Sequence, residues 1–175
     1  VYYELPRCEF EIEKSLKSRN LVSDYFDFKN EKHLIGSYGL NVFNIYTAYY
    51  LNKYGLKTIT ISPELNEEEV ISFIKNYYEK FKTYPDIEYL VYGKVENMII
   101  KKNILSLKEN DYNYALIDNK NREFSTYYTS GKTHILNYTS LKNNPNSYIR
   151  KHCNLRLDFF DESKESVEES VKSYQ

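Results

Sequence analysis

The sequence is poor in cysteine and has no long apolar run. Cys8 and Cys153 are its two cysteines, and they lie near opposite ends of the 175 residues. So low a count excludes a disulfide framework and favours a reducing, cytoplasmic compartment. No CxxC pair or other zinc-ligand spacing is present. The apolar residues are spread too evenly for a membrane-spanning segment, so we expect no membrane partner.

A cluster of basic residues and the common catalytic motifs are missing as well. The 24 Lys and Arg residues are interspersed with 25 Asp and Glu residues, for a net charge of −1. Nucleic-acid-binding domains usually gather basic residues on one face, so this distribution disfavours such a role. The absence of GxSxG, HExxH and P-loop patterns removes the common serine-hydrolase, zincin and nucleotide-binding hypotheses. The chain starts at Val1 without a charged and apolar leader, so we expect no signal peptide.

Short apolar runs alternate with segments of helical period. Residues 58–61 are all β-branched, and we predict further strands at residues 87–92 and 155–159. Runs without a polar face are typical of strands buried on both sides. The alternation therefore predicts βα units with a parallel sheet, in either a barrel or an open wound sheet.

The helical period predicts three helices. Gly55 is suited to the C-terminus of the first, Asn66 and Glu69 form a capping pair at the start of the second, and the acidic residues 161–169 favour the N-terminus of the third. The apolar positions with helical spacing are Phe43, Tyr46, Tyr50 and Tyr54 in the first helix, Val70, Phe73, Ile74, Tyr77 and Phe81 in the second, and Val167, Val171 and Tyr174 in the third.

One segment departs from this rhythm. Residues 114–117 and 123–127 resemble strands, and they flank a turn sequence at residues 118–121. Its asparagines tolerate the positive φ of a tight turn. We therefore predict an inserted β-hairpin over residues 111–130 within a single domain spanning residues 1–175.

Several stretches resemble peptidase family U32, a family of collagenase-like hydrolases, in order and in spacing. They are residues 36–44 (GSYGLNVFN), 62–65 (SPEL), 91–94 (VYGK), 133–137 (THILN) and 155–159 (LRLDF). The resemblance implies a partial TIM-like (β/α) barrel whose upstream half precedes Val1. It also implies a hydrolase acting on a peptide or protein substrate. Two alternatives stay open: an RNA-base hydroxylation protein using a small organic acid, and a degenerate member that only binds.

The sequence departs from the family where metal ligands are expected. The usual Arg-x-Pro is Lys94-Val95-Glu96, an expected Cys-Pro is Asn103-Ile104, and a second expected cysteine falls in residues 130–132, which are Ser-Gly-Lys. Thiolates are needed to hold an iron–sulfur cluster. We therefore expect no cluster or metal within this segment, and the cofactor is unknown.

In a barrel, catalytic residues lie at the carboxyl ends of the strands, because the loops converge there. We therefore take the catalytic candidates from residues that follow predicted strands. Glu64 follows a strand after a rigid proline, and with Asp158 it is a candidate general base or metal-holding pair; Glu64 alternatively caps the following helix. His134 is the third catalytic candidate, as a base or ligand, with a hydrogen-bonded core histidine as the alternative.

Substrate binding is predicted from the same segments. Lys94 is a candidate for binding a carboxylate or phosphate as a point charge, or else a solvated lysine. Asn41 and Asn44 are candidates for hydrogen bonding to substrate, with helix capping as the alternative. Tyr92 and Arg156 are included because they lie in the segments that resemble the family.

His152 and Cys153 are the one adjacent histidine and cysteine pair in the sequence. Consecutive side chains point in different directions in a helix or a strand. A nucleophile and its base usually meet across the fold. The pair therefore gives little support to a cysteine peptidase.

Overall fold

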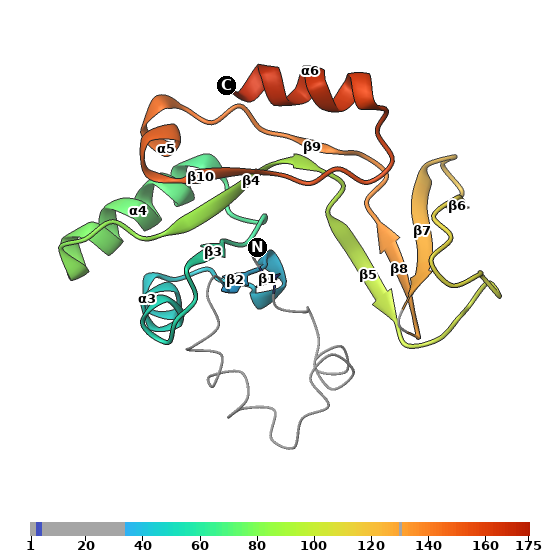
Figure 1. The fold of residues 1–175 in the computed structure, drawn as a ribbon, viewed down its shortest axis with the longest axis horizontal. Helices are drawn as coiled ribbons and strands as arrows, with labels where there is room; N and C mark the ends of the chain where they lie inside the picture. Colours follow the sequence, from blue (N-terminus) through green and yellow to red (C-terminus); the bar gives the residue numbers. More distant parts are fainter. Residues whose placement is uncertain (1–2, 5–33, 130) are drawn as a thin grey trace. The chain divides into compact units, whose positions relative to one another are not determined.

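A computed structural model describes residues 3–4, 34–129 and 131–175 of the chain (Figure 1). The chain forms two compact units, Val1–Val91 with Asn144–Arg156, and Tyr92–Asn143 with Leu157–Gln175. The predicted α/β class with parallel strands is confirmed. Among the described residues no helix is long and apolar enough to cross a membrane.

The first unit is built on a sheet with parallel strands. Its strand order is β1-β2-β3-β4-β10, and β1 to β4 pair in parallel. Within the described residues β1 and β10 are the edges of this order, so the strands do not close into a barrel there. The strands are β1 (Tyr3–Glu4), β2 (Leu34–Gly36), β3 (Thr58–Thr60), β4 (Ile87–Gly93) and β10 (Asn154–Leu157).

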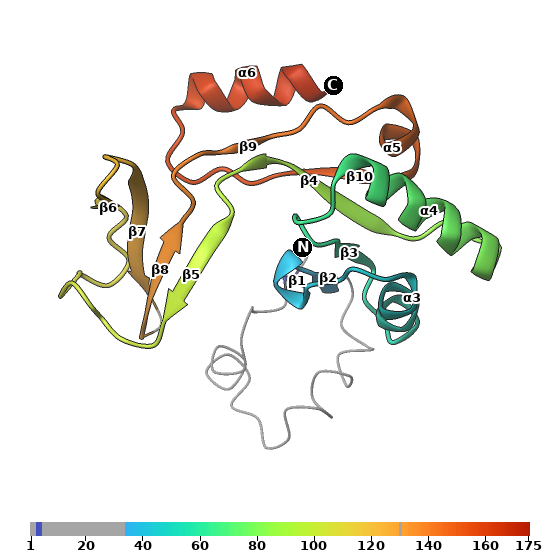
Figure 2. The same cartoon turned by 180° about the vertical axis from the view of Figure 1, so that it is seen from behind.

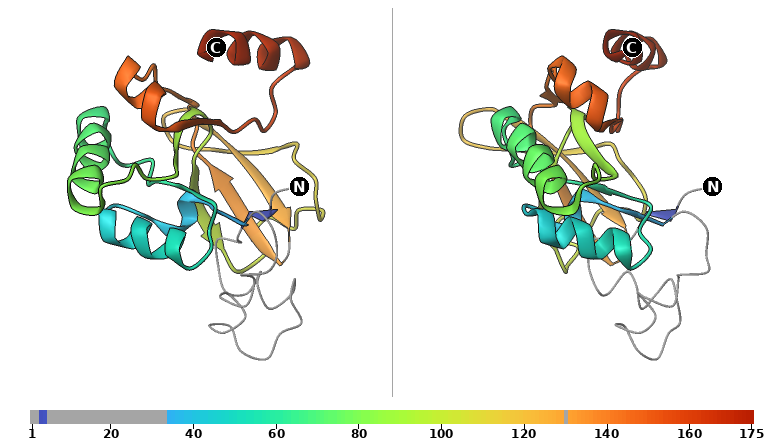
Figure 3. Two further views of the ribbon diagram at one scale, coloured as in Figure 1. Left: turned by 60° about the vertical axis from the view of Figure 1, so that its left-hand side comes forward. Right: turned by 90° about the vertical axis from the view of Figure 1, so that its left-hand side faces the viewer.

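Two helices of the first unit, α3 and α4, start at asparagine caps, whereas α5 was not predicted from the sequence. Asn44 caps α3 by accepting a hydrogen bond from the amide of Thr47, and Asn66 with Glu69 forms a complete capping box on α4. α3 packs against α4, and α4 packs against α5; Figures 2 and 3 show α3 and α4 as neighbours. These elements are the 3₁₀ turn η2 (Tyr38–Leu40), α3 (Ile45–Lys53), α4 (Glu67–Phe81) and α5 (Ser147–His152).

The buried side of α3 differs from its apolar stripe. The predicted stripe of Phe43, Tyr46, Tyr50 and Tyr54 is exposed. Ala48 is fully buried instead, and Tyr49 stacks on Phe81 with 4.0 Å between ring centroids. The small Ala48 side chain permits close packing, while the tyrosine hydroxyls keep water contacts.

The two faces of the parallel sheet differ in polarity. A Cβ at Gly36 would lie 2.8 Å from Leu40 and 3.2 Å from Leu56, and Gly36 pairs with the fully buried Ile59. Side chains alternate along a strand, so the next residue of β3, Thr60, faces the other way. Thr60 pairs with Glu88 of β4. One face is therefore apolar, and the other carries polar side chains.

The second unit holds a four-stranded antiparallel sheet in the order β5-β8-β7-β6. The predicted hairpin is present as β6 and β7, whose turn has Asn121 at φ 56° and is closed by hydrogen bonds to Asp118. β8 then pairs with both β7 and β5, so the hairpin is part of a larger sheet. The elements are β5 (Glu96–Ile100), β6 (Tyr114–Ile117), β7 (Glu123–Thr129), β8 (Lys132–Leu136), β9 (Leu141–Lys142), which pairs with the end of β4, and α6 (Lys164–Tyr174).

Candidate active site

A buried histidine and carboxylate pair lies on one face of the antiparallel sheet. His134 of β8 places its Nδ1 in a hydrogen bond with Oε1 of Glu96 of β5. The side chains of His134 and Glu96 are 7% and 8% exposed. His134 also stacks on Tyr127, its register partner on β7, at 4.8 Å and an interplanar angle of 5°. The imidazole is therefore held in a fixed plane.

The other ring nitrogen of His134, Nε2, is buried and makes no hydrogen bond within the described residues. A carboxylate on Nδ1 favours the tautomer that carries its proton there, which leaves the lone pair on Nε2. A base oriented by a carboxylate behind it is the arrangement that hydrolases use for proton transfer.

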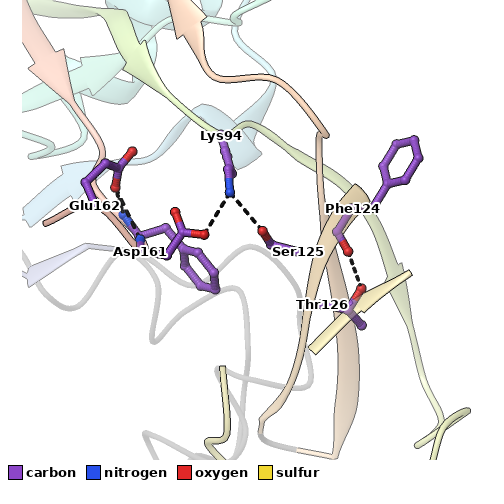
Figure 4. Close-up of polar contacts among 7 residues, drawn as sticks. Lys94, Phe124, Ser125, Thr126, Asp161 and Glu162 are labelled. Atoms are coloured by element: carbon purple, nitrogen blue, oxygen red, sulfur yellow. Dashed lines mark hydrogen bonds and ion pairs between the residues drawn. The ribbon is translucent and has the colours of Figure 1, made fainter. Parts of the chain in front are cut away.

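Lys94 provides a positive charge in the same unit. Its Nζ donates to Oγ of Ser125 at 2.9 Å and to Oδ2 of Asp161 at 2.8 Å (Figure 4). Ser125 lies two residues before Tyr127 on β7, so their side chains share a face. Because register partners also share a face, Ser125 and His134 lie on the same side of the sheet.

The segment after β10 is fixed beside these groups. Oε2 of Glu162 accepts hydrogen bonds from the backbone amides of Phe160 at 2.7 Å and Asp161 at 3.2 Å (Figure 4). The Phe160 ring lies 5.4 Å from that of Tyr127 and 5.6 Å from that of Tyr112. These three aromatic rings form an apolar wall next to the His134 imidazole.

Asp158 and Tyr92 are joined by a hydrogen bond between their backbones. The amide of Asp158 donates to the carbonyl of Tyr92 at 2.9 Å. A Cβ at Gly93, whose φ is 131°, would lie 2.3 Å from the Asp158 carbonyl oxygen. The Tyr92 ring is 7% exposed and packs 5.1 Å from the Phe159 ring. Tyr92 thus packs against Phe159, and its predicted role in substrate binding stays a prediction.

Three predicted site residues, Asn41, Asn44 and Glu64, lie in the first unit, in the loops that follow β2 and β3. Oγ of Ser62 donates to Oδ1 of Asn41 at 3.1 Å, which joins the loops after β2 and β3. Asn44 acts as the cap of α3, which was its alternative. Glu64 is exposed, and it does not cap α4, because Asn66 does so.

Arg156 belongs to a polar cluster on the sheet of the first unit. Its Nη1 donates to Oγ1 of Thr60 at 3.0 Å and lies 3.9 Å from Oε2 of Glu88. The guanidinium also lies 5.7 Å from the centroid of the Tyr38 ring. Sequence reasoning missed Thr60 and Glu88, although Glu88 is a charged residue within an otherwise apolar strand.

Cys153 offers no reactive thiol. It is buried in the first unit, and this burial raises the pKa of its thiol to about 12. Its neighbour His152 stacks on Tyr84 with 4.1 Å between centroids. The geometry therefore agrees with the weak sequence support for a cysteine peptidase.

The predicted residues fall into two groups, one in each unit. The second unit contains Tyr92, Lys94, His134 and Asp158, and the first unit contains Asn41, Asn44, Glu64 and Arg156. No group of three or more potential metal-ligating side chains gathers among the described residues. Comparison with known proteins finds no matching family model, no matching characterised protein and no matching solved structure.

Proposed function

We propose that the chain is a hydrolase that acts on peptide bonds and is related to the U32 peptidases. The observation that supports this proposal is the hydrogen bond between Nδ1 of the buried His134 and the accepting Glu96 carboxylate, with Nε2 left unpartnered among the described residues. A general base needs an oriented ring, which Glu96 and Tyr127 provide, and a lone pair that no other group occupies, which is the state of Nε2 among the described residues.

In the proposed reaction, Nε2 of His134 takes a proton from a water molecule as that water attacks the peptide carbonyl. Water is a better candidate than Ser125, because the Ser125 hydroxyl oxygen is already held by Lys94. The new C–O bond places negative charge on the carbonyl oxygen, and the Lys94 ammonium stabilises that charge. The imidazolium then returns its proton to the departing amine, which completes the hydrolysis.

The proposal also concerns the fold to which the parallel strands belong. We propose that β1 to β4 and β10 are part of a TIM-like barrel completed by residues upstream of Val1. The support is that α3 and α4 follow successive parallel strands, as in (β/α) units, and that polar residues Thr60, Glu88 and Arg156 gather on one sheet face. The scarcity of cysteine supports a cytoplasmic location.

A binding-only role is the second candidate. It is favoured by the low exposure of His134 and by the engagement of Lys94 with Asp161. Both features also occur in structural networks that stabilise a fold. The RNA-modification role stays a prediction from the family resemblance, and no described side-chain arrangement adds to it.

The test is hydrolysis of a quenched fluorescent peptide library by the full chain and by two variants, His134→Gln and Glu96→Gln. We expect rates to fall by about 10²–10⁴-fold for His134→Gln, the usual contribution of a general base. Glu96→Gln is expected to shift the acidic limb of the pH–rate profile, which a purely structural role does not move. His152→Gln is the matched control. Undiminished turnover in His134→Gln, with the fold verified by circular dichroism, rules out the assignment.

A further inference from the structure

A groove with a volume of about 770 Å³ lies between the first turn of α3 and the N-terminal half of α4. Its apolar walls include Phe43 just before α3, Tyr46 of α3 and Phe73 of α4. Phe43 is 39% exposed and Tyr46 is 51% exposed, so their rings are accessible to a ligand. The volume is within the range of sites that bind small molecules and peptide side chains.

The helix N-termini at this groove are not anion sites. Asn44 and Asn66 already accept hydrogen bonds from the first-turn amides of their own helices. The first turn of α4 also carries Glu67, Glu68 and Glu69. Three carboxylates offset the positive end of the helix dipole and repel an anion.

One carboxylate at the groove differs from its two neighbours. Oε1 of Glu67 accepts from the amide of Asn146, and Oε2 of Glu69 accepts from the amide of Asn66. Glu68 is exposed, and no intramolecular contact is seen for its carboxylate within the described residues. It lines the groove, and the charged residues of the lining are all acidic.

The polar side of the groove has a defined length. Glu68, Ser72 and Asn76 line it at intervals of four residues, which aligns them on one side of α4. Eight residues of helix span about 12 Å at about 1.5 Å each. An extended peptide of about four residues has the same length.

We propose that this groove binds a short extended peptide segment through an arginine or lysine side chain, placed between the Glu68 carboxylate and the rings of Phe43 and Tyr46. Carboxylate and aromatic faces both attract a cation, and an arginine guanidinium satisfies both at once. Asn76 and Ser72 then offer hydrogen bonds to the peptide backbone. This site lies in the first unit and does not depend on His134 or on turnover.

The experiment measures binding to the full 175-residue chain by fluorescence anisotropy. The probe is fluorescein-labelled Gly-Ser-Arg-Arg-Ser-Gly, and the matched probe carries citrulline at both arginines, which keeps the shape and removes the charge. We expect saturable binding of the arginine probe that weakens as salt rises. Equal binding of the two probes, or no saturable binding, overturns the proposal.

Variants locate the binding within the groove. Glu68→Gln and Tyr46→Leu are each expected to weaken binding of the arginine probe by about threefold or more, since each removes one attraction of ion-pair or cation–π size. Glu79→Gln is the control, because Glu79 lies exposed on the same helix, outside the groove, and its replacement changes net charge equally. Equal effects of Glu68→Gln and Glu79→Gln overturn the placement.

Discussion

The hydroxyl of Thr60 donates a hydrogen bond to the carboxylate of Glu88 at 2.8 Å, across the paired strands β3 and β4. The same hydroxyl oxygen accepts from Arg156 at 3.0 Å. A single fully buried oxygen therefore links an acidic and a basic side chain in the sheet of the first unit.

Thr60→Val tests the contribution of this link to stability. Valine has nearly the same shape but leaves Glu88 and Arg156 without their shared partner. We expect a loss of about 1–3 kcal/mol in the free energy of unfolding, the usual cost of an unsatisfied buried polar group. Urea denaturation measures it, with Thr83→Val as the control because Thr83 is exposed. Similar unfolding midpoints for both variants contradict the prediction.

Gly93→Ala tests the close approach of two backbone segments. Gly93 has φ 131°, and an added Cβ would lie 2.3 Å from the carbonyl oxygen of Asp158. Backbone, not a flexible side chain, blocks the methyl group. We expect a destabilisation of about 2–4 kcal/mol, visible as a lower thermal unfolding midpoint. An unchanged midpoint contradicts this contact.

The turn of the β6–β7 hairpin is expected to weaken in acid. Hydrogen bonds from the side chain and the backbone of Arg122 lower the pKa of Asp118. A lowered pKa in the folded state gives stability that is complete above the unfolded value, near pH 4, and is lost as pH falls through the folded value. Amide exchange across β6 and β7 between pH 5 and pH 2 measures the change. In Asp118→Asn this acid-dependent component is expected to disappear.

Cys153 is expected to resist alkylation in the folded protein. With its pKa raised to about 12 by burial, the thiol is protonated at pH 8, and the thiolate is the reactive form. Iodoacetamide treatment at pH 8, followed by peptide mass spectrometry, is expected to label Cys153 in denaturant but not in buffer. Rapid native labelling shows that the site is accessible and that this prediction is wrong.

Local sequence patterns predicted most of the elements in the described residues. The Asn66 and Glu69 capping box, the β-branched run ending at Ile61 and the turn around Asp118 all depend on residues close together in the chain. Such features are readable because their interactions are local. The exposed face of α3 could not be predicted in this way, because the spacing of aromatic residues does not say whether a tyrosine ring is buried.

Contacts between residues that are far apart in the chain could not be predicted from the sequence. His134 and Lys94 were candidates, yet their partners Glu96 and Ser125 come from other strands, and the hairpin separates β5 from β8. The strand-end rule for parallel barrels placed His134 at a strand end, whereas it lies within an antiparallel strand. Only the register of that sheet brings these side chains to one face.

The chain leaves the first unit after Val91, returns at Asn144 and leaves again after Arg156. β10 is thus synthesised after all four strands of the antiparallel sheet, although its neighbour in its own sheet is β4. During translation the antiparallel sheet has all of its strands before the parallel sheet receives its last one. The order of emergence from the ribosome therefore favours completion of the antiparallel sheet first, while the edge of β4 that later pairs with β10 is still without that partner strand.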